Sequence, residues 1–140
     1  MKTYGVCRFT TAAPQTIWRL WSDPNHWSGW NSGVKSAKVD GPLSDGMKGE
    51  MTTSRGSVHG VTFHGVVPGR GFSMSMGGPP LTTITFSCEI TPDGVGSTVA
   101  QNVAFSGPLA FIFGSMMGDE MAKRFVPVLE DLVRTAEART

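Results

Sequence analysis

Four tryptophans fall within the thirteen residues from Trp18 to Trp30. The surrounding segment, TAAPQTIWRLWSDPNHWSGW, covers residues 11–30 and contains two prolines that punctuate it. Pro14 suits the first turn of a short helix, and Pro24 ends that helix because the residue before proline disfavours helical geometry. Indole rings bring a large apolar surface that a fold must cover. So much aromatic surface in one short segment is typical of a domain that encloses something.

Length and charge limit the classes of function. At 140 residues the chain is expected to form one domain, residues 1–140. The net charge is +1 and 16% of residues are charged, so we expect no nucleic-acid partner. The longest apolar run, Leu109–Phe113, is too short for integral membrane association. The N-terminus has no secretory signal pattern, which predicts a cytoplasmic location.

Two cysteines, Cys7 and Cys88, are expected to be reduced and buried. They form no CxxC pair, and no histidine stands at metal-ligand spacing to either. The sequence therefore predicts neither a metal site nor a cofactor.

Alternation of apolar and polar residues predicts strands along most of the chain. The first expected strand is Lys2–Thr10, before the tryptophan segment. Further strands are expected at Val34–Val39, Lys48–Ser54 and Ser57–Val67, and around Phe72–Met76, Ile84–Ile90 and Val99–Phe105.

The pattern changes to helical spacing near the C-terminus. An apolar stripe consists of Phe113, Met117, Met121, Phe125, Val128, Leu132 and Ala136. Pro127 lies inside this helix and is expected to kink it. Because glycine is a poor helix former, Gly114 and Gly118 predict that the helix begins only near Gly118.

This order of elements resembles the START-like helix-grip superfamily (SRPBCC), of the polyketide cyclase/dehydrase and lipid-transport type. The resemblance covers nearly the whole chain. It rests on Ala13-Pro14 before Ile17-Trp18, Ser22-Asp23-Pro24 with Trp27 and Trp30, Pro68-x-Arg70, and the final amphipathic helix. It implies an α+β fold: a curved antiparallel sheet of about seven strands wrapped around a long C-terminal helix, with two short helices after the first strand.

The resemblance also implies a pocket between the sheet and the long helix. The ligand-binding residues it implies are Trp27, Trp30, Met51, Phe63, Phe72, Met74, Met76, Ile84, Phe86, Val103, Phe105, Phe113, Met117 and Met121. Rigid aromatic rings and adaptable thioethers suit an apolar ligand. The alternative is that these side chains simply fill a solid core.

Polar residues that could act in such a pocket are sparse. His59 and His64 lie on opposite faces of one strand, so one of them can point inward as an acid or base. His64, Arg70 and Gln101 are the candidates for proton transfer or for orienting a carbonyl. Each has an alternative: an exposed histidine, a solvated strand-end charge, or a hydrogen-bonded core amide.

Three function hypotheses follow. The leading one is binding of a small hydrophobic ligand, such as a lipid, polyketide or aromatic metabolite, by a monomer or homodimer. The second is an enzyme of the polyketide cyclase/aromatase or dehydratase type that uses the same pocket. The third is a protein-interaction module with an apolar patch near Phe111–Met117. A fold of this kind is compatible with all three.

Overall fold

The structure is a computed structural model and describes residues 3–78 and 80–139. In chain order, the elements are β1 (Thr3–Thr10), α1 (Pro14–Trp21), the 3₁₀ helix η1 (Pro24–Gly29), β2 (Val34–Val39), β3 (Lys48–Thr53), β4 (Val58–Val67), β5 (Gly71–Gly77), β6 (Thr83–Asp93), β7 (Gly96–Ser106) and α2 (Ala110–Ala138).

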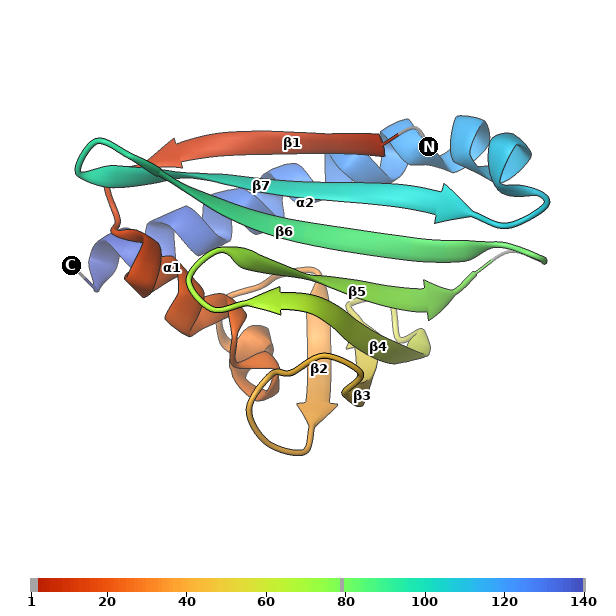
Figure 1. The fold of residues 1–140 in the computed structure, drawn as a ribbon, viewed down its shortest axis with the longest axis horizontal. Helices are drawn as coiled ribbons and strands as arrows, with labels where there is room; N and C mark the ends of the chain where they lie inside the picture. The colour runs from red at the N-terminus through yellow and green to blue at the C-terminus, as the bar shows by residue number, and fades with distance from the viewer. Residues whose placement is uncertain (1–2, 79, 140) are drawn as a thin grey trace.

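The strands form one antiparallel sheet in the order β1-β7-β6-β5-β4-β3-β2. The long helix α2 crosses behind the sheet in Figure 1 and packs mainly on β1 and β7. The short helix α1 packs against α2, β6 and η1, and η1 lies next to β2. The predicted α+β helix-grip fold is therefore confirmed, with seven strands. No helix within residues 3–78 and 80–139 combines the length and apolarity that crossing a bilayer requires.

The two faces of the sheet differ in chemistry, as period-two patterning requires. Gln101, Cys88 and Phe72 are register partners across β7, β6 and β5, on the face toward α2. The opposite face carries hydroxyl ladders, with Ser75 Oγ lying 3.1 Å from Thr85 Oγ1. One sheet face is thus available for a core or cavity, and the other faces water.

The helix α2 begins at Ala110, two turns before the expected start near Gly118. The glycines are explained by packing. A Cβ atom on Gly118 would lie 2.5 Å from ring carbons of Tyr4 on β1, and one on Gly114 would lie 3.3 Å from the ring of Phe105 on β7. The first turns of α2 can approach the sheet closely because both positions lack a side chain.

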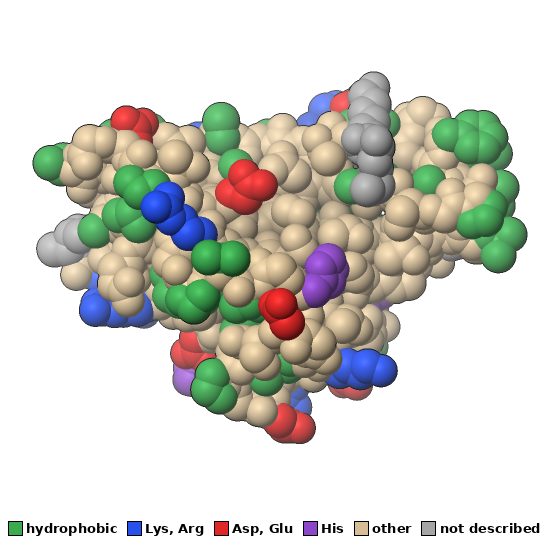
Figure 2. Space-filling model, in the orientation of Figure 1, with side chains coloured by type: hydrophobic (Ala, Val, Ile, Leu, Met, Phe, Trp, Pro, Cys, Tyr) green, Lys and Arg blue, Asp and Glu red, His purple; other side chains and the backbone are tan. Residues whose placement is uncertain are grey.

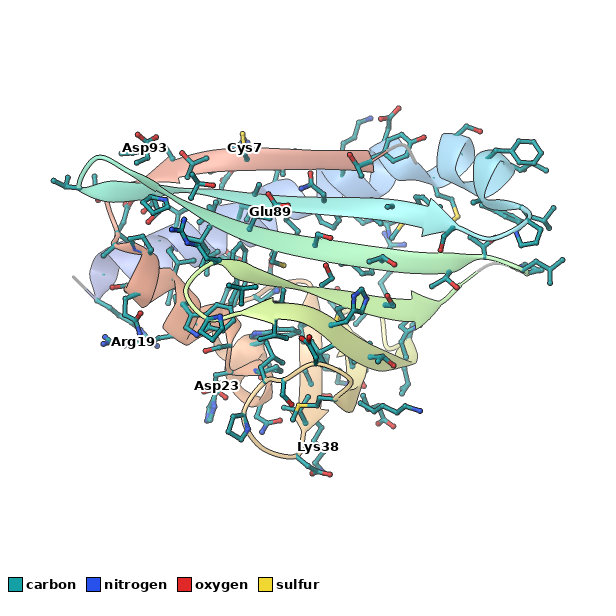
Figure 3. All side chains as sticks on the ribbon, in the orientation of Figure 1. Cys7, Arg19, Asp23, Lys38, Glu89 and Asp93 are labelled. Carbon is teal, nitrogen blue, oxygen red and sulfur yellow. The ribbon has the colours of Figure 1, made fainter. Side chains whose placement is uncertain are left out.

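The cysteines lie on different faces of the sheet. Cys88 is buried on β6, whereas Cys7 is exposed on β1, where its sulfur points away from the strand (Figure 3). Both are free thiols, and β7 separates β1 from β6. The expected burial is confirmed for Cys88 and is wrong for Cys7, because its neighbour Val6, not Cys7, faces inward.

Candidate ligand-binding cavity

A cavity of about 650 Å³ lies between the inner face of the sheet, α2 and the segment from Trp27 to Val34. Sites for small organic molecules usually have volumes of roughly 300–1,000 Å³. The sheet supplies lining residues from β3 to β7, and α2 supplies Met117, Met121, Arg124 and Phe125. The cavity therefore has the size and the enclosure of a ligand site.

The floor of the cavity is apolar. The lining residues that are buried from outside solvent are Trp21, Trp27, Met51, Phe72, Met74, Met76, Ile84, Cys88, Phe125 and Val128. An interior of this kind binds ligands by removing apolar surface from water, worth about 25 cal/mol per Å².

Aromatic packing holds one side of this floor. The indole of Trp27 stacks on Phe72 with ring centroids 6.0 Å apart, and its Nε1–H donates a hydrogen bond of 3.1 Å to the carbonyl of Trp21. Phe63 packs against both Trp27 and Phe72 from behind. The tryptophan-rich segment thus builds a wall with fixed ring positions.

The rim of the cavity is polar. Its exposed members are Ser32, Ser54, Arg55, Ser57, Gly77, Gly78, Arg124 and Pro127. They come from the loop before β2, the β3–β4 hairpin, the end of β5 and the middle of α2. A ligand would meet these groups at the entrance and apolar groups below.

Hydrogen bonds join the parts of this rim. The carboxylate of Asp131 on α2 accepts from the backbone N–H of Ser32 at 3.1 Å, and the N–H of Ser54 donates to the carbonyl of Gly33 at 3.1 Å. The chain of contacts therefore links α2, the loop before β2 and the hairpin that carries Arg55. Gly56 has a φ of 90°, a left-handed conformation that favours glycine in this tight turn.

The pKa of Asp131 is lowered. Partial burial acts in the opposite direction, but the hydrogen bonds from Ser32 and the ion pair with Arg134 outweigh it. Asp131 is therefore a carboxylate whose charge stabilises the rim loop.

Gln101 brings an amide to the cavity wall. Its Oε1 is buried and has no hydrogen-bond partner among the described residues. A buried acceptor left unpaired costs roughly 1–3 kcal/mol. Gln101 is therefore a group that a bound donor would satisfy.

Cys88 also lines the cavity, but its thiol is a poor nucleophile. Burial raises its pKa far above the usual range, with a smaller contribution from the charge of Glu89. The reactive thiolate is therefore not populated at neutral pH.

Most of the expected pocket residues lie on the cavity. The lining includes Trp27, Trp30, Met51, Phe72, Met74, Met76, Ile84, Phe86, Met117 and Met121. Phe63 lies behind the aromatic wall, and Val103 and Phe105 belong to the filled core. Phe105 packs beneath the first turns of α2, and Phe113 lies on α2 itself but away from the lining. Both the cavity and the filled core therefore exist, in different parts of the same layer.

Of the three polar candidates, only one lies on the cavity. Gln101 lines the cavity, whereas His64 and Arg70 are exposed and lie outside the lining. His64 is on the outer face, where its Nε2 lies 2.7 Å from Ser75 Oγ. The histidine on the inner face is His59, opposite Met51. Neither His64 nor Arg70 can therefore contact a molecule in this cavity.

Sequence reasoning missed the functional groups at the rim. Arg55 lies in a turn and Arg124 lies at the edge of the apolar stripe, so neither stands out from strand or helix periodicity. Trp21 lines the cavity but is not among the pocket residues that the family resemblance implies.

A separate apolar surface lies where α2 begins. Phe111, Ile112 and Met116 are exposed, and Figure 2 shows hydrophobic side chains gathered at this end of the molecule.

The described residues contain no group of three or more His, Cys, Asp or Glu side chains suited to hold a metal ion.

Comparison with known proteins agrees with this architecture. The model of a family described as polyketide cyclase/dehydrase and lipid transport matches residues 8–137. No curated protein matches the sequence.

Solved structures with the same fold share little sequence. A START superfamily protein from Mycobacterium smegmatis is 14% identical, with a TM-score of 0.77 and 99% coverage of both chains. XoxI from Bacillus cereus is 14% identical, with a TM-score of 0.77, covering 98% of this chain and 96% of that one. DynU16, from the dynemicin biosynthetic locus, is 14% identical, with a TM-score of 0.75, covering 100% of this chain and 49% of that one.

Proposed function

This chain belongs to the polyketide cyclase/dehydrase and lipid-transport family, and we propose that it binds a small hydrophobic molecule in the cavity between its sheet and α2. The observation that carries this proposal is the apolar floor of a cavity of about 650 Å³. Burial of ligand surface against aromatic and thioether side chains supplies the affinity. The ligand class is a lipid, polyketide or aromatic metabolite.

The cavity also offers a way to orient such a ligand. The unpaired Oε1 of Gln101 accepts a hydrogen bond from a hydroxyl or amide of the bound molecule. One polar group within an apolar wall fixes the direction of binding more than it adds affinity. We also propose a cytoplasmic location, since the chain has only two cysteines and β7 lies between the strands that carry them.

The test is ligand-linked stability with 1-dodecanol as a neutral apolar probe. Binding to the folded state alone raises the free energy of unfolding by about 2.7 kcal/mol at a hundred times Kd. In a Met121→Trp variant, the larger side chain fills part of the cavity, so the stabilisation is lost. Met116→Trp is the matched control, because Met116 lies on the same helix, is 69% exposed and lies outside the lining. Equal stabilisation of the two variants would overturn the proposal.

A cyclase or dehydratase is the second candidate function, and His59 is the observation that favours it. His59 lines the cavity, and imidazole transfers protons near neutral pH. An enzyme of this type requires that His59→Gln abolish the conversion of a poly-β-ketone substrate while the substrate still binds. Mass spectrometry of the incubated substrate gives the answer, and no conversion by the original protein removes this candidate.

Self-association through an apolar surface is the third candidate, favoured by the exposed Phe111, Ile112 and Met116. It predicts concentration-dependent association, measured by sedimentation velocity, that Phe111→Ser and Met116→Ser together abolish. A concentration-independent monomer would exclude self-association through this surface.

A further inference from the structure

We propose that the ligand is an anionic amphiphile, with its apolar part on the cavity floor and one carboxylate or phosphate group at the rim, held by Arg55 and Arg124. This inference rests on the proposed binding function and specifies the chemical class of ligand for the same cavity.

The charged side chains of the described lining are all cationic. Two arginines, Arg55 and Arg124, line the cavity. No aspartate or glutamate is among the lining residues that the structure describes. The whole chain has nearly balanced charges, with 12 Lys and Arg against 11 Asp and Glu. The one-sided charge therefore belongs to the cavity and does not reflect the composition.

The two arginines form no ion pair with any residue that the structure describes. On α2, Lys123 pairs with Glu120 at 3.2 Å, and Arg134 pairs with Asp131. Among residues 3–78 and 80–139, Arg124 and Arg55 form no ion pair. The charges of Lys123 and Arg134 on the same helix are thus compensated, while the two guanidinium groups at the cavity remain available.

Hydrogen bonds at the rim connect the two elements that carry these arginines, α2 and the β3–β4 hairpin. Asp131 binds the N–H of Ser32, and the N–H of Ser54 binds the carbonyl of Gly33. The hydrogen bonds connect α2 to the β3–β4 hairpin through the loop before β2. Arg124 lies on the helix and Arg55 at the hairpin turn, so both are anchored to one framework at the entrance.

The cavity has charged side chains at its entrance and apolar side chains inside. This arrangement favours an amphiphile over a uniformly apolar ligand. Arg55 and Arg124 are exposed, whereas Met74, Phe72 and Trp27 below them are buried. A guanidinium group donates several hydrogen bonds in a planar fork that matches a carboxylate or a phosphate. A ligand with its anionic group at the rim keeps that group partly hydrated and buries only its apolar part.

The experiment compares four probes that share a twelve-carbon chain: dodecanoate, dodecyl phosphate, 1-dodecanol and dodecyltrimethylammonium. Quenching of tryptophan fluorescence below the micelle concentration gives each Kd at pH 8. Because the two arginines are exposed, their contribution to the binding free energy is modest. We expect the anions to bind about tenfold more tightly than the alcohol. The ratio between dodecanoate and dodecyl phosphate identifies the preferred anionic group.

Substitution then assigns the preference to the rim. In the double variant Arg55→Gln with Arg124→Gln, the affinity for dodecanoate falls to the affinity that the same variant has for 1-dodecanol. Arg70→Gln is the matched control, because Arg70 is also exposed but lies outside the cavity lining, and it leaves the anion preference intact. Added salt reduces the preference through screening.

The outcomes separate this inference from the function on which it rests. Binding of the anions and the alcohol with equal affinity, or tighter binding of the cation, overturns the anionic specificity and leaves hydrophobic binding intact. A tenfold preference that survives the double variant overturns the role of the two arginines. Failure of every probe to bind overturns the proposed function itself.

Discussion

At the scale of single residues, the side of the sheet on which a residue lies decides its role. His59 and His64 differ in position by five, an odd number, so the alternation predicts opposite faces. The alternation alone does not say which face is inner, because apolar residues occur on both faces of the strand. Phe63 shares the parity of His59, and Val66 shares the parity of His64. The structure assigns His59 to the cavity and His64 to the hydroxyl-rich outer face.

Gln101 is the residue whose energetics are most informative. Gln101→Leu removes an amide whose buried Oε1 has no partner in the described chain. We expect the free energy of unfolding without ligand to rise by about 1 kcal/mol, since an unsatisfied acceptor is removed. Urea denaturation measures the change. A loss of more than about 1 kcal/mol would mean that Gln101 makes a stabilising contact.

The two thiols should differ sharply in reactivity. Burial raises the pKa of Cys88, so its thiolate is absent at pH 8, whereas Cys7 is exposed. A thiol reagent such as Ellman's reagent should modify one cysteine rapidly in the folded protein and the second only after unfolding. In a Cys7→Ser variant the rapid reaction disappears. Rapid reaction of Cys88 in that variant would show that the cavity opens.

At the scale of elements, strands were more predictable than the helix. Val34–Val39 was predicted at its observed bounds, because a half-buried strand records its two faces directly in its sequence. The predicted start of α2 was wrong because Gly114 and Gly118 oppose a helix by local propensity. The packing of α2 on Tyr4 and Phe105 nevertheless requires these two glycines.

Gly118→Ala distinguishes helix propensity from packing by the sign of the change in the free energy of unfolding. Helix propensity alone predicts a gain of up to about 1 kcal/mol. The new Cβ would lie 2.5 Å from the ring of Tyr4, which itself packs against Phe105, so we expect a net loss of about 1–2 kcal/mol. Chemical denaturation measures it. Gly60→Ala on β4, where a Cβ meets nothing within 4 Å, controls for the loss of a glycine. Stabilisation by Gly118→Ala would disprove the packing role.

Asp131 links α2 to the rim loop, and its contribution depends on pH. Since its pKa is lowered in the folded protein, its stabilising effect is complete above the ordinary carboxyl value of 3.8 and is lost as the pH falls through the folded pKa. Asp131→Asn should lower the free energy of unfolding by about 1 kcal/mol at pH 7. The difference from the original protein should shrink near pH 2. Urea denaturation at both pH values checks this, and a pH-independent difference would contradict it.

At the scale of the whole molecule, the sequence predicted the sheet, the long helix packed against it and most of the apolar side chains that line the cavity. It could not predict where the layer between sheet and helix is filled and where it is hollow. Val103 and Phe105 follow the same inward pattern as Phe72 and Met74, but only the latter pair lines the cavity. The first turns of α2 pack on Phe105 through Gly114. Alternation reports the direction of a side chain, whereas the hollow depends on how the helix crosses the sheet.

The central claim is that this hollow takes up one apolar molecule. Native mass spectrometry of the delipidated protein with increasing 1-dodecanol tests it most directly. We predict a saturable complex of one ligand per chain that Met121→Trp suppresses and Met116→Trp retains. The absence of a complex, or a non-saturating series of adducts that Met121→Trp leaves unchanged, would contradict the claim.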